Sequence, residues 1–177
     1  MQQFREIRAW SPTPEHLAQL VSDAKSICDI PVHPAGCAEE AVRRADIVVL
    51  ATSSCSPTID NDWVSPGSLI ISLGAYRPNM REMDPALVAR ARVVVDSRAA
   101  ALREAGDIVQ GIRERRFSEA HIVAELGEVV TGRAPGRTGE EQVVIFKSLG
   151  MAVEDLAAAQ LAYARAREHQ KGREISL

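Results

Sequence analysis

Small and hydroxyl-bearing residues follow an apolar run near the middle of the sequence. Thr52 and Ser53 come directly after the run Ile47–Ala51. Their hydroxyl groups can donate and accept hydrogen bonds, and residues this small let the backbone approach a flat ring or a ribose. Ligands collect beyond the carboxyl ends of strands in open α/β sheets, so this position favours a binding role. A polar loop that binds nothing would contain the same residues, and the sequence leaves that alternative open.

A second candidate position follows the next apolar run. Leu73, Gly74 and Ala75 end the run that begins at Ser68, and Gly74 has no side chain to hold a ligand away from the backbone. Tyr76 comes next and carries a phenol group. A tyrosine in ordinary surroundings has a pKa of about 10, so near neutral pH it donates a proton or a hydrogen bond more readily than it acts as a base. The alternative is that Tyr76 only lines the pocket.

The remaining polar groups show no metal or disulfide pattern. The three cysteines lack CxxC spacing, and the four histidines lie far apart in the sequence. Residues 60–62 (Asp-Asn-Asp) do not continue a calcium-binding spacing and are typical of a turn. We therefore predict no bound metal.

Alternating strand and helix signals must position these candidate residues. The expected strands are residues 5–10, 30–33, 47–51, 68–73, 92–96 and 142–146. The expected helices are residues 14–24, 39–45, 84–91, 122–130 and a long one from 153 to about 171. Continuous apolar runs of strand length are typical of parallel strands covered on both faces. The pattern predicts an α/β fold with a doubly wound parallel sheet and right-handed crossovers.

Composition excludes several classes of protein. The chain has 177 residues, 46% hydrophobic and 25% charged, which suits one domain, or one domain with a piece of another. Its net charge of -3 comes from interspersed acids and bases, so we expect no nucleic-acid partner. No apolar run approaches the roughly 18 residues that span a bilayer, and no signal-peptide core is present, so we expect no membrane association and a cytoplasmic location.

Seven blocks of the sequence together resemble the ornithine cyclodeaminase/mu-crystallin family. Their order and spacing match along nearly the whole chain, and the most specific are Gly-Ala-Tyr-Arg-Pro at 74–78 and the block that begins Phe-Lys-Ser-Leu-Gly at 146. The blocks are residues 8–13, 45–53, 73–84, 95–97, 105–107, 124–128 and 146–155.

The resemblance implies a Rossmann-type dinucleotide-binding domain joined to a dimerisation and substrate domain. It divides this chain into a partial dinucleotide-binding domain, residues 1–141, and a returning segment of the dimerisation/substrate domain, residues 142–177. A homodimer is the implied assembly of a complete protein.

The first strand and the glycine-rich phosphate loop of such a domain have no counterpart in this sequence. Only residues 1–4 precede the strand expected at residues 5–10. The first strand is central in the order 3-2-1-4-5-6, so we expect a sheet that is open along two neighbouring edges. On this basis the chain is expected to be a fragment, a mis-started gene product or a degenerate paralogue.

The resemblance also implies which residues contact the cofactor, NAD or NADP. The expected cofactor-binding residues are Ser11, Thr13, Thr52, Ser53, Leu73, Gly74, Ala75 and Ser148. Ser11 and Thr13 would meet the adenosine ribose and Gly74 would flank the nicotinamide, although Thr13 as a simple helix cap is an equal alternative. An acid near Ser11 would favour NAD and a base would favour NADP, and Ser11-Pro12 fits neither pattern.

The implied activity depends on Tyr76, which together with Lys147 is expected to bind substrate. Cyclodeaminases of the family have an aspartate at this position, and ketimine reductases have a small hydroxyl residue. Tyrosine shifts the expectation towards imine reduction or amino-acid dehydrogenation at the C–N bond of a small amino or imino acid. No catalytic residue is assigned. The alternatives are an ornithine cyclodeaminase, a non-catalytic ligand-binding or assembly module, and an inactive fragment.

Overall fold

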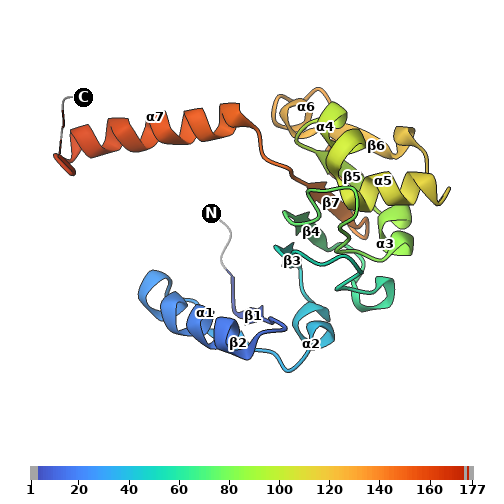
Figure 1. Cartoon of the computed structure of the whole chain (residues 1–177), viewed down its shortest axis with the longest axis horizontal. Coiled ribbons are helices and arrows are strands. Elements are labelled where there is room, and N and C mark those ends of the chain that lie inside the picture. Colours follow the sequence, from blue (N-terminus) through green and yellow to red (C-terminus); the bar gives the residue numbers. More distant parts are fainter. Residues whose placement is uncertain (1–3, 174, 176–177) are drawn as a thin grey trace.

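The computed structural model describes residues 4–173 and residue 175, which form two separate parallel β-sheets with surrounding helices (Figure 1). The strands are β1 (Ile7–Ala9), β2 (Val32–Pro34), β3 (Ile47–Leu50), β4 (Leu69–Ser72), β5 (Arg92–Val95), β6 (Ile122–Glu125) and β7 (Val144–Lys147). The helices are α1 (Pro14–Ile27), α2 (Ala38–Val42), α3 (Pro85–Arg90), α4 (Arg98–Glu104), α5 (Gly106–Arg113), α6 (Leu126–Val130) and α7 (Ala152–Glu168). This arrangement confirms the predicted α/β class with parallel strands.

The larger sheet has the order β3-β4-β7-β5-β6, and all of its strands are parallel. The last strand in the sequence therefore lies in the middle of the sheet. β7 was expected in the returning segment that begins at residue 142, and it is hydrogen-bonded to both β4 and β5. After β7, the helix α7 extends away from the larger sheet, and none of its residues is buried (Figure 1). The division into two domains stays a prediction.

In the described part of the chain, β1 and β2 pair with each other and with no strand of the larger sheet. The expected opening is therefore present, with β1 and β3 each at the edge of its own sheet. Arg8 on β1 contacts α2 and the residue that follows it, because its side chain donates hydrogen bonds to the carbonyl oxygens of Glu40 (2.9 Å) and Arg43 (2.7 Å).

The expected helix at residues 122–130 is wrong in its first half. Residues 122–125 form β6 beside β5, and the helix α6 begins only at Leu126. Ile122 and Ala124 are buried whereas Val123 between them is 39% exposed, which is the two-residue alternation of a strand. Pairing with β5 overrides the helical signal of this segment. Helices α4 and α5 were not predicted.

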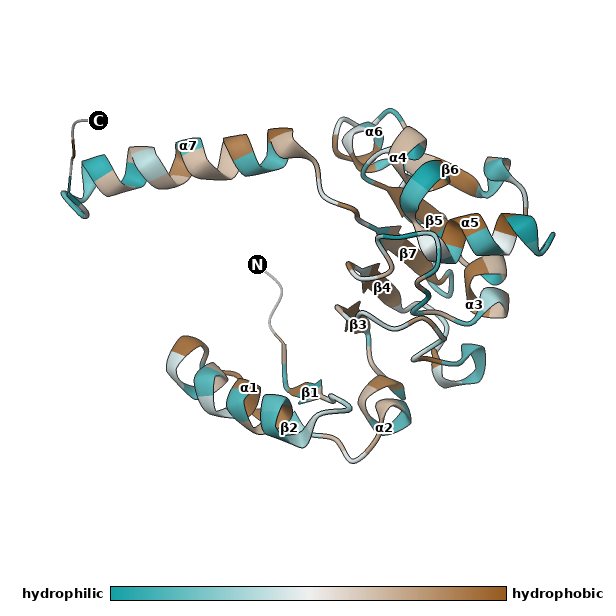
Figure 2. Cartoon of the chain, viewed as in Figure 1, coloured by the Kyte–Doolittle hydropathy of each residue, from teal (hydrophilic) through white to brown (hydrophobic). Residues whose placement is uncertain are grey.

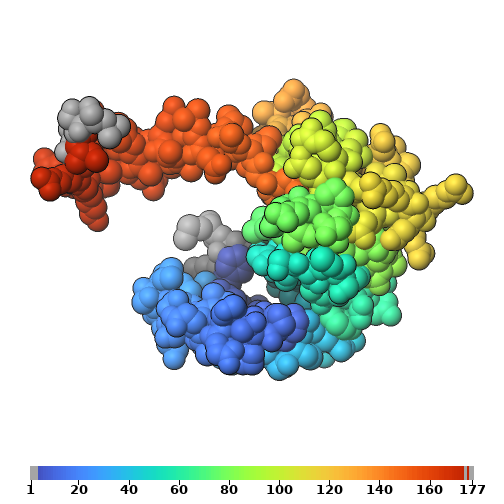
Figure 3. Space-filling model, viewed as in Figure 1, coloured from blue at the N-terminus to red at the C-terminus, as the bar shows by residue number. Residues whose placement is uncertain are grey.

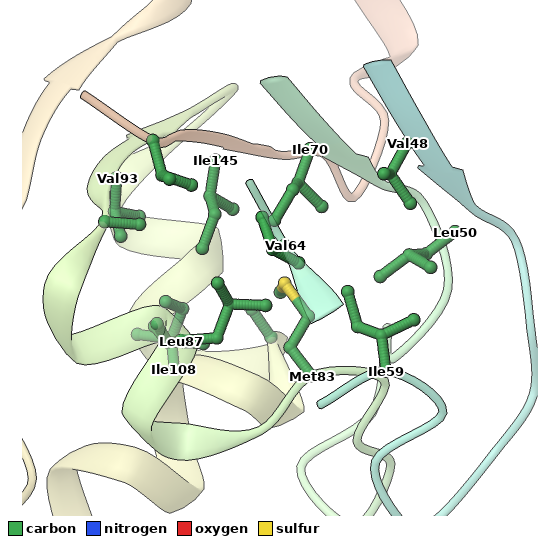
Figure 4. Close-up of a cluster of buried hydrophobic side chains, with 14 of the residues drawn as sticks. Val48, Leu50, Ile59, Val64, Ile70, Met83, Leu87, Val93, Ile108 and Ile145 are labelled. Atoms are coloured by element: carbon green, nitrogen blue, oxygen red, sulfur yellow. The ribbon is translucent and has the colours of Figure 1, made fainter. Parts of the chain in front are cut away.

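One face of the larger sheet packs on α3 and α5 and forms the core (Figure 4). Ile70 and Ile145 from the sheet and Leu87 and Ile108 from the two helices are fully buried. Asp84 and Pro85 begin α3 as predicted, because the Asp84 carboxylate accepts the backbone N–H of Ala86 at 2.7 Å. None of the helices in the described residues is long and apolar enough to cross a membrane.

The central position of β7 predicts a large effect of Ile145→Ala. Since Ile145 is fully buried between neighbouring strands and helices, its truncation should lower the free energy of unfolding by about 2–5 kcal/mol. Urea unfolding measures the change. The matched change Val123→Ala, on the exposed side of edge strand β6, should cost less than about 1 kcal/mol. Equal losses for the two variants would contradict the central place of β7.

Candidate functional site

The carboxyl ends of the larger sheet bring most of the predicted site residues together. Leu50, Ser72, Lys147 and Val95 lie in register across β3, β4, β7 and β5, so the loops that follow these strands are neighbours. A pocket of about 310 Å³ lies at the ends of β3 and β4. Its lining residues are Ala51, Thr52, Ser53, Leu73, Gly74 and Tyr76. Five of the predicted residues thus line one pocket.

Glu82, which was not predicted, holds the two loops of this pocket together. Its side chain is fully buried, and Oε1 accepts hydrogen bonds from the backbone N–H of Thr52 (2.6 Å) and from its hydroxyl group (2.9 Å). Oε2 accepts a hydrogen bond from the Ser72 hydroxyl group at 2.8 Å. One carboxylate therefore ties the loop after β3 to the end of β4.

Gly74 is required by this close packing. A Cβ atom at this position would overlap the carbonyl oxygen of Thr52 and the carboxylate of Glu82. The absence of a side chain at Gly74 therefore serves contacts inside the protein, and its predicted approach to a nicotinamide stays a prediction. Ala75 follows with a positive φ of 44°, a backbone conformation that costs a non-glycine residue about 1–2 kcal/mol. Its carbonyl oxygen accepts the N–H of Gly106 at 2.9 Å, which holds the strained loop on α5.

Lys147 is not among the residues that line the pocket. Its side chain is fully buried, and the ammonium group donates hydrogen bonds to the carbonyl oxygens of Ser72 (3.3 Å), Gly74 and Ser148 (3.1 Å). Burial lowers the pKa of Lys147, and the charges of Asp107, Glu82 and Asp96 act in the opposite direction. The predicted substrate contact of Lys147 stays a prediction, while its observed partners are the backbone of the pocket loops.

Asp107 forms the next layer of the same network. Its Oδ1 accepts the backbone N–H groups of Glu82 and Met83, both at 3.0 Å, and its buried Oδ2 has no hydrogen-bond partner among the residues that the structure describes. Burial raises the pKa of Asp107 from 3.8 to about 6, and the two N–H groups and the charge of Lys147 offset part of that rise.

Asp96 anchors the loop that contains Ser148. Its Oδ2 accepts hydrogen bonds from the Ser148 hydroxyl group (3.2 Å) and from the backbone N–H groups of Leu149 (2.6 Å) and Gly150 (2.7 Å). The Ser148 hydroxyl group therefore has a partner inside the protein, and its predicted cofactor contact stays a prediction.

Ser11 and Thr13 lie after β1, on the smaller sheet, and do not line the pocket. Thr13 occupies the N-cap position of α1, but its side chain makes no capping hydrogen bond. Instead its backbone N–H donates to the Ser11 hydroxyl group at 3.2 Å. Thr13 is therefore the N-cap residue without a side-chain cap, and the predicted contact of Ser11 and Thr13 with the adenosine ribose stays a prediction.

Comparison with known proteins decides the family. The model of the ornithine cyclodeaminase/mu-crystallin family matches residues 1–170. The chain belongs to the ornithine cyclodeaminase/mu-crystallin family. It is 41% identical over 160 residues to the ketimine reductase mu-crystallin of Mus musculus, a match that covers 90% of this chain and 47% of the relative.

Two solved structures of reductases superpose on nearly all of the chain. The first is the Thermococcus litoralis Δ1-pyrroline-2-carboxylate reductase in complex with NADH and L-proline, with a TM-score of 0.90, 32% identity, and coverage of 97% of this chain and 53% of the reductase. The second is the iminosuccinate reductase of Paracoccus denitrificans in complex with NAD+, with a TM-score of 0.86, 32% identity, and coverage of 99% and 53%. The chain therefore spans about half the length of the family members that it matches.

The buried acids of this family member were missed as site residues because the sequence does not show burial. Glu82, Asp96 and Asp107 all lie in the blocks that carry the family resemblance. Their only local signal is an acidic residue with small or apolar neighbours, such as Val95 before Asp96. The contacts that give them a role come from other strands and loops.

The raised pKa of Asp107 predicts a pH-dependent stability. Because the folded chain binds the proton more tightly than the unfolded chain, stability from this group is present at low pH and is lost as pH rises from about 4 to about 6. The shift corresponds to about 3 kcal/mol. Relative to wild type, Asp107→Asn should gain up to about that amount in unfolding free energy between pH 4 and pH 7. Asp29→Asn, at an exposed position, should show no such gain, and equal pH profiles for both variants would contradict the assignment.

Removing the Lys147 charge should destabilise the chain strongly. Lys147→Met removes the donor to the carbonyl oxygens of Gly74 and Ser148 and leaves the neighbouring buried acids without a cation, so we expect a loss of about 3–5 kcal/mol in urea unfolding. Lys25→Met, at an exposed position of α1, should change stability by less than about 0.5 kcal/mol. A loss of similar size in both variants would show that the network is not the cause.

Proposed function

We propose that this chain forms the nicotinamide end of an NAD(P)-dependent oxidoreductase site. The reaction is imine reduction, or amine oxidation, at the C–N bond of a small amino or imino acid. The pocket at the carboxyl ends of β3 and β4 supports this function, because it lies in a chain that superposes on a reductase in complex with NADH and L-proline.

The size and lining of the pocket fit part of a dinucleotide. Its volume of about 310 Å³ is at the small end for ligand pockets, about 300–1,000 Å³, so it suits a nicotinamide ring with its ribose better than a whole dinucleotide. Leu73 and Gly74 would lie beside the ring, and the hydroxyl groups of Thr52 and Ser53 would bind the ribose. Ser11 and Thr13, at the end of β1, would serve the adenosine side. When bound, the cofactor supplies or accepts the hydride.

Tyr76 and Arg77 give the substrate side of the site its chemistry. Tyr76 is about half exposed at the rim of the pocket, and the guanidinium group of Arg77 lies 5.4 Å from the centre of its ring. A cation here attracts the carboxylate of an amino or imino acid. The phenol group would donate to the substrate nitrogen the proton that reduction of an imine to an amine requires.

The test uses a fusion of this chain to the half of mouse ketimine reductase mu-crystallin that lies outside the match. The assay measures reduction of Δ1-pyrroline-2-carboxylate as the decrease in NADH or NADPH absorbance. Tyr76→Phe should lower kcat by about 10²–10⁴-fold, because it removes a proton donor and keeps the ring. Tyr163→Phe, on the exposed surface of α7, should leave kcat unchanged. Release of ammonia from ornithine without imine reduction would instead favour the cyclodeaminase alternative.

A further inference from the structure

We infer that Glu82 is a positioning residue for ligand binding, because it fixes the Thr52 hydroxyl group as a hydrogen-bond acceptor, and not a donor, towards the pocket. The matching ligand group is a sugar hydroxyl, such as those of the nicotinamide ribose, and not a phosphate. The identity of this ligand rests on the proposed function. The polarity of the Thr52 hydroxyl group rests on the contacts of Glu82 alone.

Both hydrogen-bond donors of Thr52 are used inside the protein. Its backbone N–H and its hydroxyl group donate to Oε1 of Glu82, at 2.6 and 2.9 Å. A hydroxyl group has one proton and two lone pairs, so only the lone pairs are left for other partners. One of them accepts the backbone N–H of Ser54 at the long distance of 3.4 Å. The other is available to a ligand in the pocket that Thr52 lines.

The backbone of Glu82 is held on both sides, which fixes the place of its carboxylate. Its N–H donates to Oδ1 of Asp107 at 3.0 Å, and its carbonyl oxygen accepts the N–H (2.8 Å) and the hydroxyl group (3.0 Å) of Thr58. The strands β3 and β4 are largely apolar (Figure 2), so a carboxylate buried at their ends depends on the few polar groups there. Thr52 and Ser72 supply them.

The loops after β3 and β4 pack against each other around this carboxylate. Their teal and green atoms adjoin in the space-filling view (Figure 3). Gly74 permits the approach, because a Cβ atom there would overlap the Thr52 carbonyl oxygen and the Glu82 carboxylate. A displacement of Glu82 therefore disturbs Thr52 and Gly74 together. These are the residues proposed to contact the ribose and the nicotinamide ring.

A phosphate group is a poor ligand for this part of the pocket. Phosphate oxygens accept hydrogen bonds and bind to N–H and O–H donors, and neither donor of Thr52 is free. The charge of the Glu82 carboxylate, one hydrogen bond away from the Thr52 hydroxyl group, also repels an anion. A ribose hydroxyl group can donate to Thr52 and accept from the exposed hydroxyl group of Ser53. The contacts of Glu82 therefore select the sugar.

The test measures two competitors of NADH on the fusion to the remaining half of mouse mu-crystallin. Nicotinamide riboside contains the ring and its ribose without a phosphate, and ADP contains phosphates without nicotinamide. Glu82→Met keeps the length of the side chain and removes the acceptor, so it should weaken the riboside by about tenfold, as expected for one hydrogen bond, and leave ADP unchanged. Glu82→Gln should restore the riboside to within about twofold, because its amide oxygen can accept both donors of Thr52.

Thr52→Val tests the same hydrogen bond without a change to the buried carboxylate. It removes the hydroxyl group, keeps the shape of the side chain and should weaken the riboside by about tenfold. In the Glu82→Met background the same change should cost less than about threefold, because the hydroxyl group is no longer held in place. Glu104→Met is the matched control, since this side chain is 43% exposed and pairs with Arg103. It should leave both competitors unchanged.

Hydrogen exchange measures the positioning in the full chain without any cofactor. The backbone N–H of Thr52 donates to Glu82 at 2.6 Å, so Glu82→Met should speed its exchange by about tenfold or more relative to the amides of β7. Glu82→Gln should leave the ratio of the two rates close to that of wild type. A general loss of stability would speed both sets of amides and is thereby distinguished.

Three outcomes would overturn the inference: unchanged riboside competition in Glu82→Met, an equal loss of the riboside and ADP, or unchanged exchange of the Thr52 amide. If Glu82→Met does not fold, unchanged competition in Thr52→Val overturns it instead. Any of these results in a fusion that reduces the imine leaves the proposed function standing. Riboside binding that depends on Glu82 in a fusion that reduces no imine supports the positioning role and counts against the proposed reaction. A wild-type fusion that binds neither NADH nor the riboside overturns both.

Discussion

The ammonium group of Lys147 is buried at the end of the central strand β7, and the loops at the carboxyl edge of the sheet are arranged around it. A buried cation must find acceptors for its protons and opposite charges nearby. Backbone carbonyl groups of β4, of the loop after β4 and of the loop after β7 supply the acceptors. Glu82, Asp96 and Asp107 supply the charges. This requirement fixes the paths of both loops.

The same carboxylates also bind backbone N–H groups, so each acid joins two parts of the chain. Glu82 joins the loop after β3 to β4, Asp96 joins the end of β5 to the loop after β7, and Asp107 joins α5 to the segment before α3. Together they set the shape of a pocket whose own lining is small and only weakly polar. The network stabilises a geometry in which Thr52, Leu73 and Tyr76 face one space.

The two ends of the proposed site depend on different parts of the fold. The residues proposed to contact the nicotinamide follow β3 and β4, whose side chains pack into the core. The residues proposed to contact the adenosine follow β1 of the smaller sheet, which is joined to the larger sheet through α2 and the Arg8 hydrogen bonds.

Patterns within the sequence were enough to predict the family, from its seven blocks, and the α/β class, from the apolar runs. They also predicted five of the six residues that line the pocket, because small residues after an apolar run are a local feature. The sequence also placed Asp84 and Pro85 at the start of α3, since capping involves only neighbouring residues. The tertiary structure alone decided that β7 is central, that residues 122–125 are a strand, and that Lys147 points into the protein. It also revealed Glu82, Asp96 and Asp107 as the support of the site. These features depend on hydrogen bonds between residues far apart in the sequence, and no local pattern of residues encodes such pairings.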